Sequence, residues 1–79
     1  MFQIVRCMLD VNGSVAVRRP LQPLYELWED AMAMAEFDSC RLGDEYGFDD
    51  DQGCWWASDS SGRMHRFIVE PGVVEDVAA

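Results

Sequence analysis

The chain of 79 residues carries fifteen acidic residues against six arginines, and it has no lysine, so its net charge is −9. This length fits one domain, and 49% hydrophobic residues are too many for a disordered chain. No apolar run reaches the roughly 18 residues that a membrane-spanning helix needs. The negative charge disfavours direct binding to nucleic acid or to an anionic membrane.

The two ends and the cysteines predict the organisation of the chain and its compartment. We expect residues 1–72 to form a single domain and residues 73–79 to be a loosely ordered tail. Arg6 interrupts the apolar start, so we expect no signal peptide. The three cysteines are widely spaced and odd in number, which favours free thiols in a reducing cytoplasm over a disulfide framework. They are Cys7, Cys40 and Cys54.

Two strands joined by a tight turn are predicted at the start of the chain. Residues 3–10 are rich in β-forming side chains, and Val15–Arg18 form the returning strand. Asn12-Gly13 between them is the strongest short hairpin signal, because a type I′ turn needs positive φ at both central positions. Pro20 then ends the second strand.

A helix is predicted from Leu21 to about Phe37. Its apolar residues recur on one arc at helical spacing; they are Leu24, Leu27, Trp28, Ala31, Met34 and Ala35, with Tyr25 and Met32 beside them. The opposite arc carries Glu26, Glu29, Asp30 and Glu36. We expect this amphipathic helix to bury its leucine, tryptophan and methionine side chains and to expose an unbroken row of carboxylates. Asp38 returns to the apolar side, so the helix should end near it, with Gly43 as a stop or turn residue shortly afterwards.

The second half of the chain predicts three short strands separated by turns. The strands are expected at residues 45–48, 54–57 and 64–69. The order ββ-α-βββ predicts an α+β fold, in which one antiparallel sheet of four to five short strands carries the single helix on one face. Because one helix covers only one face, the other face must be solvated or used for binding.

Trp55 and Trp56 are consecutive on a strand, so their side chains must point to opposite faces of the sheet. A loop of even length between the last two strands places Trp56 with Phe67. We take the Phe67 face as the core because its strand positions contain no arginine, which puts Trp55 on the outer face. There Trp55 is either covered by another part of the chain or an anchor for a partner or a second copy. A three-residue loop or a bulge would exchange the two tryptophans.

The chain shows no recognisable catalytic set, so we expect a protein that is not an enzyme and carries no cofactor. His65, the only histidine, reads as a half-buried residue of an alternating strand. A zinc site made by His65 and the three cysteines lacks the close ligand pairs of structural zinc sites. The segment 49–53 fails as a calcium loop, since Gly53 would stand at position five and Ser60 at position twelve. The sequence also shows no basic patch.

The charge is concentrated in the middle of the chain. Residues 20–62 hold eleven acids against Arg41, a net charge of −10. Such an excess costs self-repulsion in a small domain, which favours a cationic partner over a purely solubilising role. Extended basic surfaces occur mainly on nucleic-acid-binding proteins. Carboxylates ~6.8 Å apart on a strand, or ~5–6 Å apart on a helix, can imitate a row of phosphates.

A very short, lysine-free, acidic α+β chain without a catalytic set resembles the small inhibitors that phages and mobile elements make, such as anti-CRISPR proteins and other DNA mimics. The resemblance covers size, charge and architecture. It implies a stoichiometric inhibitor in the cytoplasm of a bacterial host cell, whose acidic surface blocks the basic nucleic-acid-binding surface of a target such as a CRISPR effector complex. The residues in contact would be Glu26, Glu29, Asp30, Glu36, Asp44, Glu45, Asp49, Asp50 and Asp51.

The alternative is a small protein–protein interaction module or accessory subunit, monomeric or homodimeric, that uses an exposed aromatic sheet face. In that case Trp55 would be the principal contact and the acids would serve solubility.

Overall fold

A computed structural model describes residues 1–72, and this part of the chain contains five strands and one helix. They follow one another as β1 (Phe2–Leu9), β2 (Val15–Pro20), α1 (Trp28–Leu42), β3 (Glu45–Asp49), β4 (Cys54–Ser58) and β5 (Met64–Pro71). The predicted α+β fold with the order ββ-α-βββ is therefore confirmed, and the sheet has five strands. The predicted tail, residues 73–79, lies outside the described residues.

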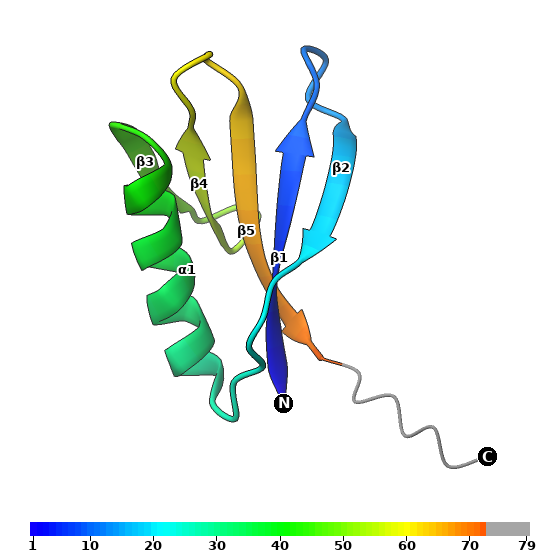
Figure 1. Ribbon diagram of the computed structural model, residues 1–79, viewed down its shortest axis with the longest axis vertical. Coiled ribbons are helices and arrows are strands. Elements are labelled where there is room, and N and C mark those ends of the chain that lie inside the picture. The colour runs from blue at the N-terminus through cyan, green and yellow to red at the C-terminus, as the bar shows by residue number, and fades with distance from the viewer. Residues whose placement is uncertain (73–79) are drawn as a thin grey trace, which may run out of the picture.

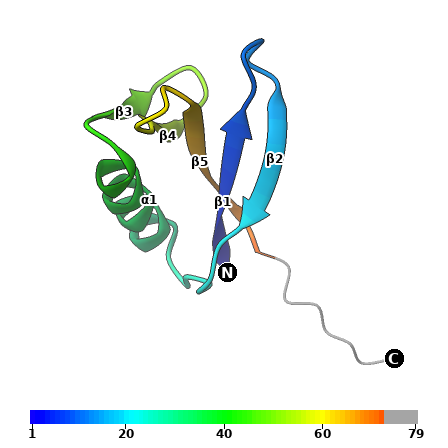
Figure 2. The same ribbon diagram turned by 45° about the horizontal axis from the view of Figure 1, so that its top comes forward.

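The strands form one antiparallel sheet in the order β2-β1-β5-β4-β3. The pairing of β1 with β5 in the centre brings the first strand beside the last one. Helix α1 lies over the part of the sheet formed by β1, β5, β4 and β3. Figures 1 and 2 show the helix on one side of the molecule and β2 on the other, with β1 and β5 between them. Helix α1 does not contact β2, whose residues are all exposed.

Each of the three hairpins is closed by an aspartate whose Oδ1 atom accepts two backbone N–H groups of the turn that follows; they are Asp10, Asp49 and Asp59. Each turn also contains a glycine with positive φ, at Gly13, Gly53 and Gly62. No other residue type has positive φ within residues 1–72. The predicted type I′ turn is therefore wrong, because Asn12 does not adopt the required conformation, and the N–H of Gly13 instead donates to the carbonyl of Asp10 at 3.0 Å.

The helix begins at Trp28 and not at Leu21. The N–H of Leu21 donates to the carbonyl of Ile4 at 2.8 Å, and Tyr25 exchanges two backbone hydrogen bonds with Phe2. These bonds tie Leu21 and Tyr25 to β1, so the segment between them does not join the helix. Local helical spacing did not reveal this long-range pairing.

The helix ends at Leu42, beyond Asp38, and Gly43 follows it as predicted. Glycine is required at this position because the backbone of residue 43 passes close to that of Ser58. Its φ of −167° is open to any residue, but a Cβ atom there would lie 1.9 Å from the carbonyl oxygen of Ser58. Gly43 thus lets the chain leave the helix directly against the end of β4.

The helix packs on the sheet through small residues. Its fully buried positions are Ala31, Ala35 and Ser39, and the core cluster consists of Ile4, Ala31, Ala35, Ala57 and Phe67. The predicted burial of the large apolar residues is wrong, since Leu27, Trp28 and Met34 are 56%, 46% and 37% exposed. Small side chains let the helix axis approach the sheet, which leaves the larger ones at the margins. The exposed helix surface is consequently a mixture of acids and apolar groups, not an unbroken row of carboxylates.

Candidate functional site

Trp55 lies on the helix-covered face of the sheet, and Trp56 lies on the opposite one. Trp55 pairs with Phe67 across β4 and β5 and packs against the core cluster, whereas Trp56 pairs with Arg66. The predicted placement of Trp55 on the outer face is therefore wrong. The cause is the connection 59–63, which has an odd number of residues and pairs Ser58 with Met64.

The outer sheet face carries the second tryptophan in a row of five neighbouring residues, one from each strand: Gly47, Trp56, Arg66, Cys7 and Arg18. Trp56 is half-buried, and its indole ring fills the space where Gly47 has no side chain, since a Cβ atom there would lie 3.1 Å from ring atoms. Arg18 at the far end of the row forms an ion pair with Glu70. This face therefore presents one aromatic group and two arginines without a covering helix.

Eight of the nine predicted acidic contact residues are exposed, the exception being the partly buried Asp49. Asp49 has a structural role, because its Oδ1 accepts the N–H groups of Asp51 and Gln52. Within residues 1–72, Arg18 forms an ion pair with Glu70 and His65 forms a hydrogen bond with Asp59, and neither contact uses any of the nine acids. The negative charge of these residues is therefore not neutralised within the described part of the chain.

Acids and aromatic groups share one exposed surface, the α1–β3 face, which we define by Glu29, Ala33, Glu36, Phe37 and Cys40 of the helix and Tyr46 and Phe48 of β3. Five of these line a hollow of about 300 Å³: Ala33, Glu36, Phe37, Cys40 and Tyr46. The three aromatic side chains, Phe37, Tyr46 and Phe48, are 54%, 43% and 41% exposed. Phe48 is supported from below by an edge-on contact with Trp55, at a ring-centroid distance of 5.3 Å.

His65 is fully buried at 1% exposure, not half-buried as expected. Its Nε2 atom lies 2.8 Å from Oδ2 of Asp59, and its Nδ1 atom accepts a hydrogen bond from Nε of Arg6 at 3.3 Å. Since Nδ1 accepts, the ring proton lies on Nε2 and donates to Asp59. Hydrogen bonds from Ser61 and from His65 hold the pKa of Asp59 well below its usual range. This arrangement fixes the orientation of Arg6.

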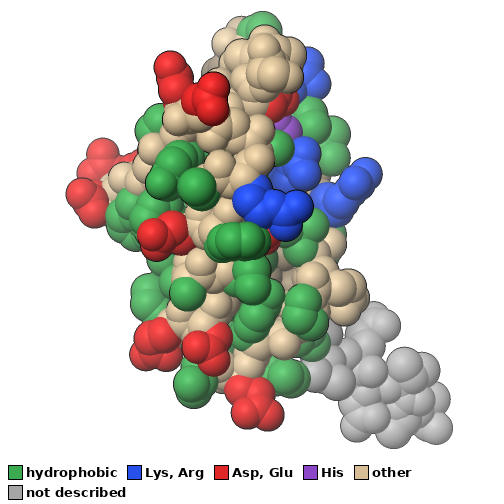
Figure 3. Space-filling view, turned by 60° about the vertical axis from the view of Figure 1, so that its left-hand side comes forward, with side chains coloured by type: hydrophobic (Ala, Val, Ile, Leu, Met, Phe, Trp, Pro, Cys, Tyr) green, Lys and Arg blue, Asp and Glu red, His purple; other side chains and the backbone are tan. Residues whose placement is uncertain are grey.

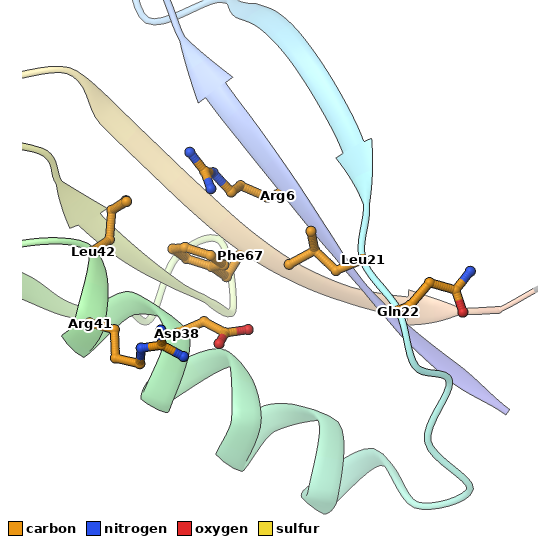
Figure 4. A pocket seen from close by; sticks show the side chains of 7 residues that line it. All are labelled: Arg6, Leu21, Gln22, Asp38, Arg41, Leu42 and Phe67. Atoms are coloured by element: carbon orange, nitrogen blue, oxygen red, sulfur yellow. The ribbon is translucent and has the colours of Figure 1, made fainter.

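Arginines from distant parts of the sequence line two neighbouring hollows that share Arg6. Arg6 pairs with Arg19 across β1 and β2, and the two line a hollow of about 70 Å³ with Met8 and Val17. Arg6 also borders a larger cavity of about 400 Å³ between α1 and β1. We call this larger cavity the arginine groove; its lining is Arg6, Leu21, Gln22, Asp38, Arg41, Leu42 and Phe67 (Figure 4).

Acidic and basic side chains occupy different parts of one face of the molecule. Figure 3 shows red acidic side chains spread from one end of the visible face to the other, with blue arginines gathered along one side. Asp38 is the acid that lies within the arginine groove, and burial raises its pKa although Arg41 and Arg6 act in the opposite direction. Sequence reasoning missed this grouping, because strand register and helix placement bring the arginines together.

Within residues 1–72, no three side chains of histidine, cysteine, aspartate or glutamate are grouped closely enough to hold a metal ion. The helix in that part of the chain is too short and too polar to cross a membrane. Comparisons with protein-family models, with curated proteins and with solved structures found no match.

Proposed function

We propose that this protein is a non-enzymatic, stoichiometric inhibitor that binds the basic nucleic-acid-binding surface of another protein in the cytoplasm of a bacterial host. A CRISPR effector complex is an example of such a target. The observation that supports the proposal best is that the candidate acids are exposed and unpaired. Eight of the nine are exposed, and none of the nine is neutralised by an ion pair within residues 1–72. Unneutralised charge on a folded surface attracts opposite charge and orients the encounter.

The α1–β3 face is the surface we propose for contact. Glu29 and Glu36 lie on one side of the helix, about 10 Å apart along its axis, and the exposed Phe37 follows Glu36 directly. This spacing is wider than that of successive phosphates, so a purely electrostatic imitation of DNA is not what the face offers. Aromatic groups are enriched at the energetically important centres of protein interfaces, while charges there set orientation and association rate. The target surface should therefore be basic and partly apolar.

Charge-reversal variants test this proposal in affinity capture from a bacterial lysate over a salt series. Glu29→Lys with Glu36→Lys should abolish capture of the partner, because this pair adds repulsion where attraction is proposed. Asp50→Lys with Asp51→Lys, in the turn after β3, should weaken capture less, because these acids lie outside the α1–β3 face. Asp49 stays unchanged since it closes the β3–β4 turn. Glu75→Lys with Asp76→Lys changes the net charge equally and serves as the matched control. Equal recovery of the same partner by all variants would exclude the acidic surface.

A second candidate function is an interaction module or homodimer that uses the outer sheet face. The observation that favours it is the half-buried Trp56, which lies between Gly47 and Arg66 on a face without a helix. In this case light scattering should show a dimer that Trp56→Ala dissociates and that added salt leaves intact. A monomer, or a dimer unaffected by Trp56→Ala, would exclude a homodimer formed through this face.

A further inference from the structure

The arginine groove is built around one guanidinium that buried neighbours hold in place. Arg6 donates from Nε to Nδ1 of His65, and His65 is held on its other side by Asp59. His65 is 1% exposed, so this connection lies inside the domain. Within residues 1–72, no hydrogen bond or ion pair engages the terminal nitrogens of Arg6. An arginine fixed through Nε presents its remaining N–H groups as a preformed fork.

The groove beside this guanidinium has the size and the lining of a small-ligand site. Its volume of about 400 Å³ falls within the ~300–1,000 Å³ typical of ligand pockets. Figure 4 shows the ring of Phe67 between Arg6 and Leu21 on the strand side and Leu42 on the helix side. The second guanidinium, of Arg41, lies over the ring of Phe37 at 5.5 Å from its centre, which restricts its position on the helix. An apolar floor with a cation at each side is complementary to an anion that carries an apolar group.

The charges of the lining select among anions. Arg6 and Arg41 contribute two positive charges and Asp38 one negative charge, so the ionised lining carries a net charge of +1. A monoanion matches this charge, whereas a phosphate dianion would be repelled by Asp38. A planar carboxylate also fits the guanidinium fork through two parallel hydrogen bonds.

We propose that the arginine groove binds a carboxylate attached to an apolar group, with the carboxylate held by the Arg6 fork, the apolar group against Phe67, and the Arg41 guanidinium adding attraction from the helix side. A small apolar carboxylic acid and the C-terminal residue of a peptide share this chemistry. Burial raises the pKa of Asp38 and so disfavours its ionised form. When Asp38 is ionised, its negative charge repels a bound anion and limits the affinity of the groove. The proposal does not depend on the function proposed above, since it concerns the lining of the arginine groove and not the acids of the α1–β3 face.

NMR titration with three probes tests the ligand class, with the arginine Nε–H signals as the readout. N-acetyl-leucine supplies a carboxylate and an apolar group, N-acetyl-leucinamide lacks the charge, and inorganic phosphate lacks the apolar group. We expect N-acetyl-leucine to shift the Arg6 signal and to bind at least about tenfold more tightly than either other probe. Equal binding of the amide, equal binding of phosphate, or no shift with N-acetyl-leucine would overturn the proposal.

Three variants locate the site. Arg41→Gln should weaken N-acetyl-leucine binding about tenfold, and Asp38→Asn should tighten it severalfold because it removes a like charge. Arg66→Gln, on the outer face, is the matched control and should bind as the wild type does. Arg41 lies on the exposed side of the helix and outside the buried Arg6–His65 contact, so its variant tests the site even if Arg6→Gln fails to fold. Unchanged binding by Arg41→Gln would overturn the proposal.

The source of the carboxylate is decided by one further pair of probes. Acetyl-Ala-Ala-Leu with a free C-terminus should bind more tightly than N-acetyl-leucine if the groove takes a peptide end. Tighter binding of N-acetyl-leucine would assign the groove to small carboxylic acids.

Discussion

Asp59 and His65 lie on either side of the β4–β5 turn, and the Oδ2 atom of the carboxylate is 2.8 Å from Nε2 of the buried ring. The other oxygen of Asp59 accepts the N–H groups of Ser61 and Arg63, so a single side chain closes the hairpin and holds the histidine. Through its second nitrogen, His65 orients Arg6 in the neighbouring strand. A turn residue thus determines the geometry of the arginine groove.

The Asp59 contact predicts a loss of stability in acid. Its folded-state pKa lies below the usual value, so the stabilisation is present above about pH 4 and is lost as the pH falls below it. Asp59→Asn should lower the free energy of unfolding at neutral pH and lose less stability between neutral pH and about pH 3 than the wild type does. Urea unfolding over a pH series measures both quantities. Parallel curves for the two proteins would contradict the assignment.

Asp38 should change the stability with pH in the opposite direction to Asp59. Burial raises its folded-state pKa, so the ionised side chain opposes folding above that pKa, and the penalty disappears as the pH falls toward about 4. Asp38→Asn should therefore unfold at a higher urea concentration than the wild type at neutral pH, and the difference should shrink in acid. A variant less stable than the wild type at neutral pH would show that attraction by Arg41 and Arg6 outweighs burial.

Gly43 predicts a strong steric effect. A methyl group there would meet the backbone carbonyl of Ser58 at 1.9 Å, so Gly43→Ala should cost about 3 kcal/mol of unfolding free energy. Gly47→Ala is the matched comparison, because its methyl group would meet the movable ring of Trp56 at 3.1 Å and should cost about 1 kcal/mol. Chemical denaturation of both variants checks the order, and a larger loss for Gly47→Ala would contradict the described packing.

The three thiols should differ in reactivity. Cys40 is exposed, whereas Cys7 and Cys54 are 2% and 1% exposed, and burial raises the pKa of both buried thiols. An aromatic disulfide reagent should modify Cys40 roughly 100-fold faster near neutral pH. Mass spectrometry of the digested protein identifies the modified site. Because Cys40 lies on the α1–β3 face, a bulky label on it should also block partner binding, and undiminished binding by the labelled protein would argue against that face.

The fold could be predicted from the sequence because its signals are local. Alternating β-forming residues, three glycine-containing turns and one helical segment are visible without knowledge of distant contacts. The start of the helix was missed because backbone bonds from Leu21 and Tyr25 to β1 override a helical pattern. The burial of the helix was missed for a related reason, since Ala31 and Ala35 contact the sheet while Trp28 stands at its margin.

The candidate sites required strand register, which one sequence does not provide. One residue of difference in the connection 59–63 decides whether Trp55 or Trp56 faces outward, since neighbouring strand residues point to opposite faces. The arginine groove likewise depends on the pairing of Arg6 with Phe67 and on a helix that brings Arg41 opposite. Exposure of the acids, in contrast, was predictable from their charge alone.

Displacement from immobilised DNA tests the central claim most directly. Bacterial proteins are loaded on a DNA column at low salt, and the purified protein or its Glu29→Lys, Glu36→Lys variant is then passed over it. The proposed function predicts that the wild-type protein releases a defined DNA-binding protein with which it co-elutes, and that the variant releases none. Retention of every DNA-bound protein at low salt, or equal release by the variant, would contradict it.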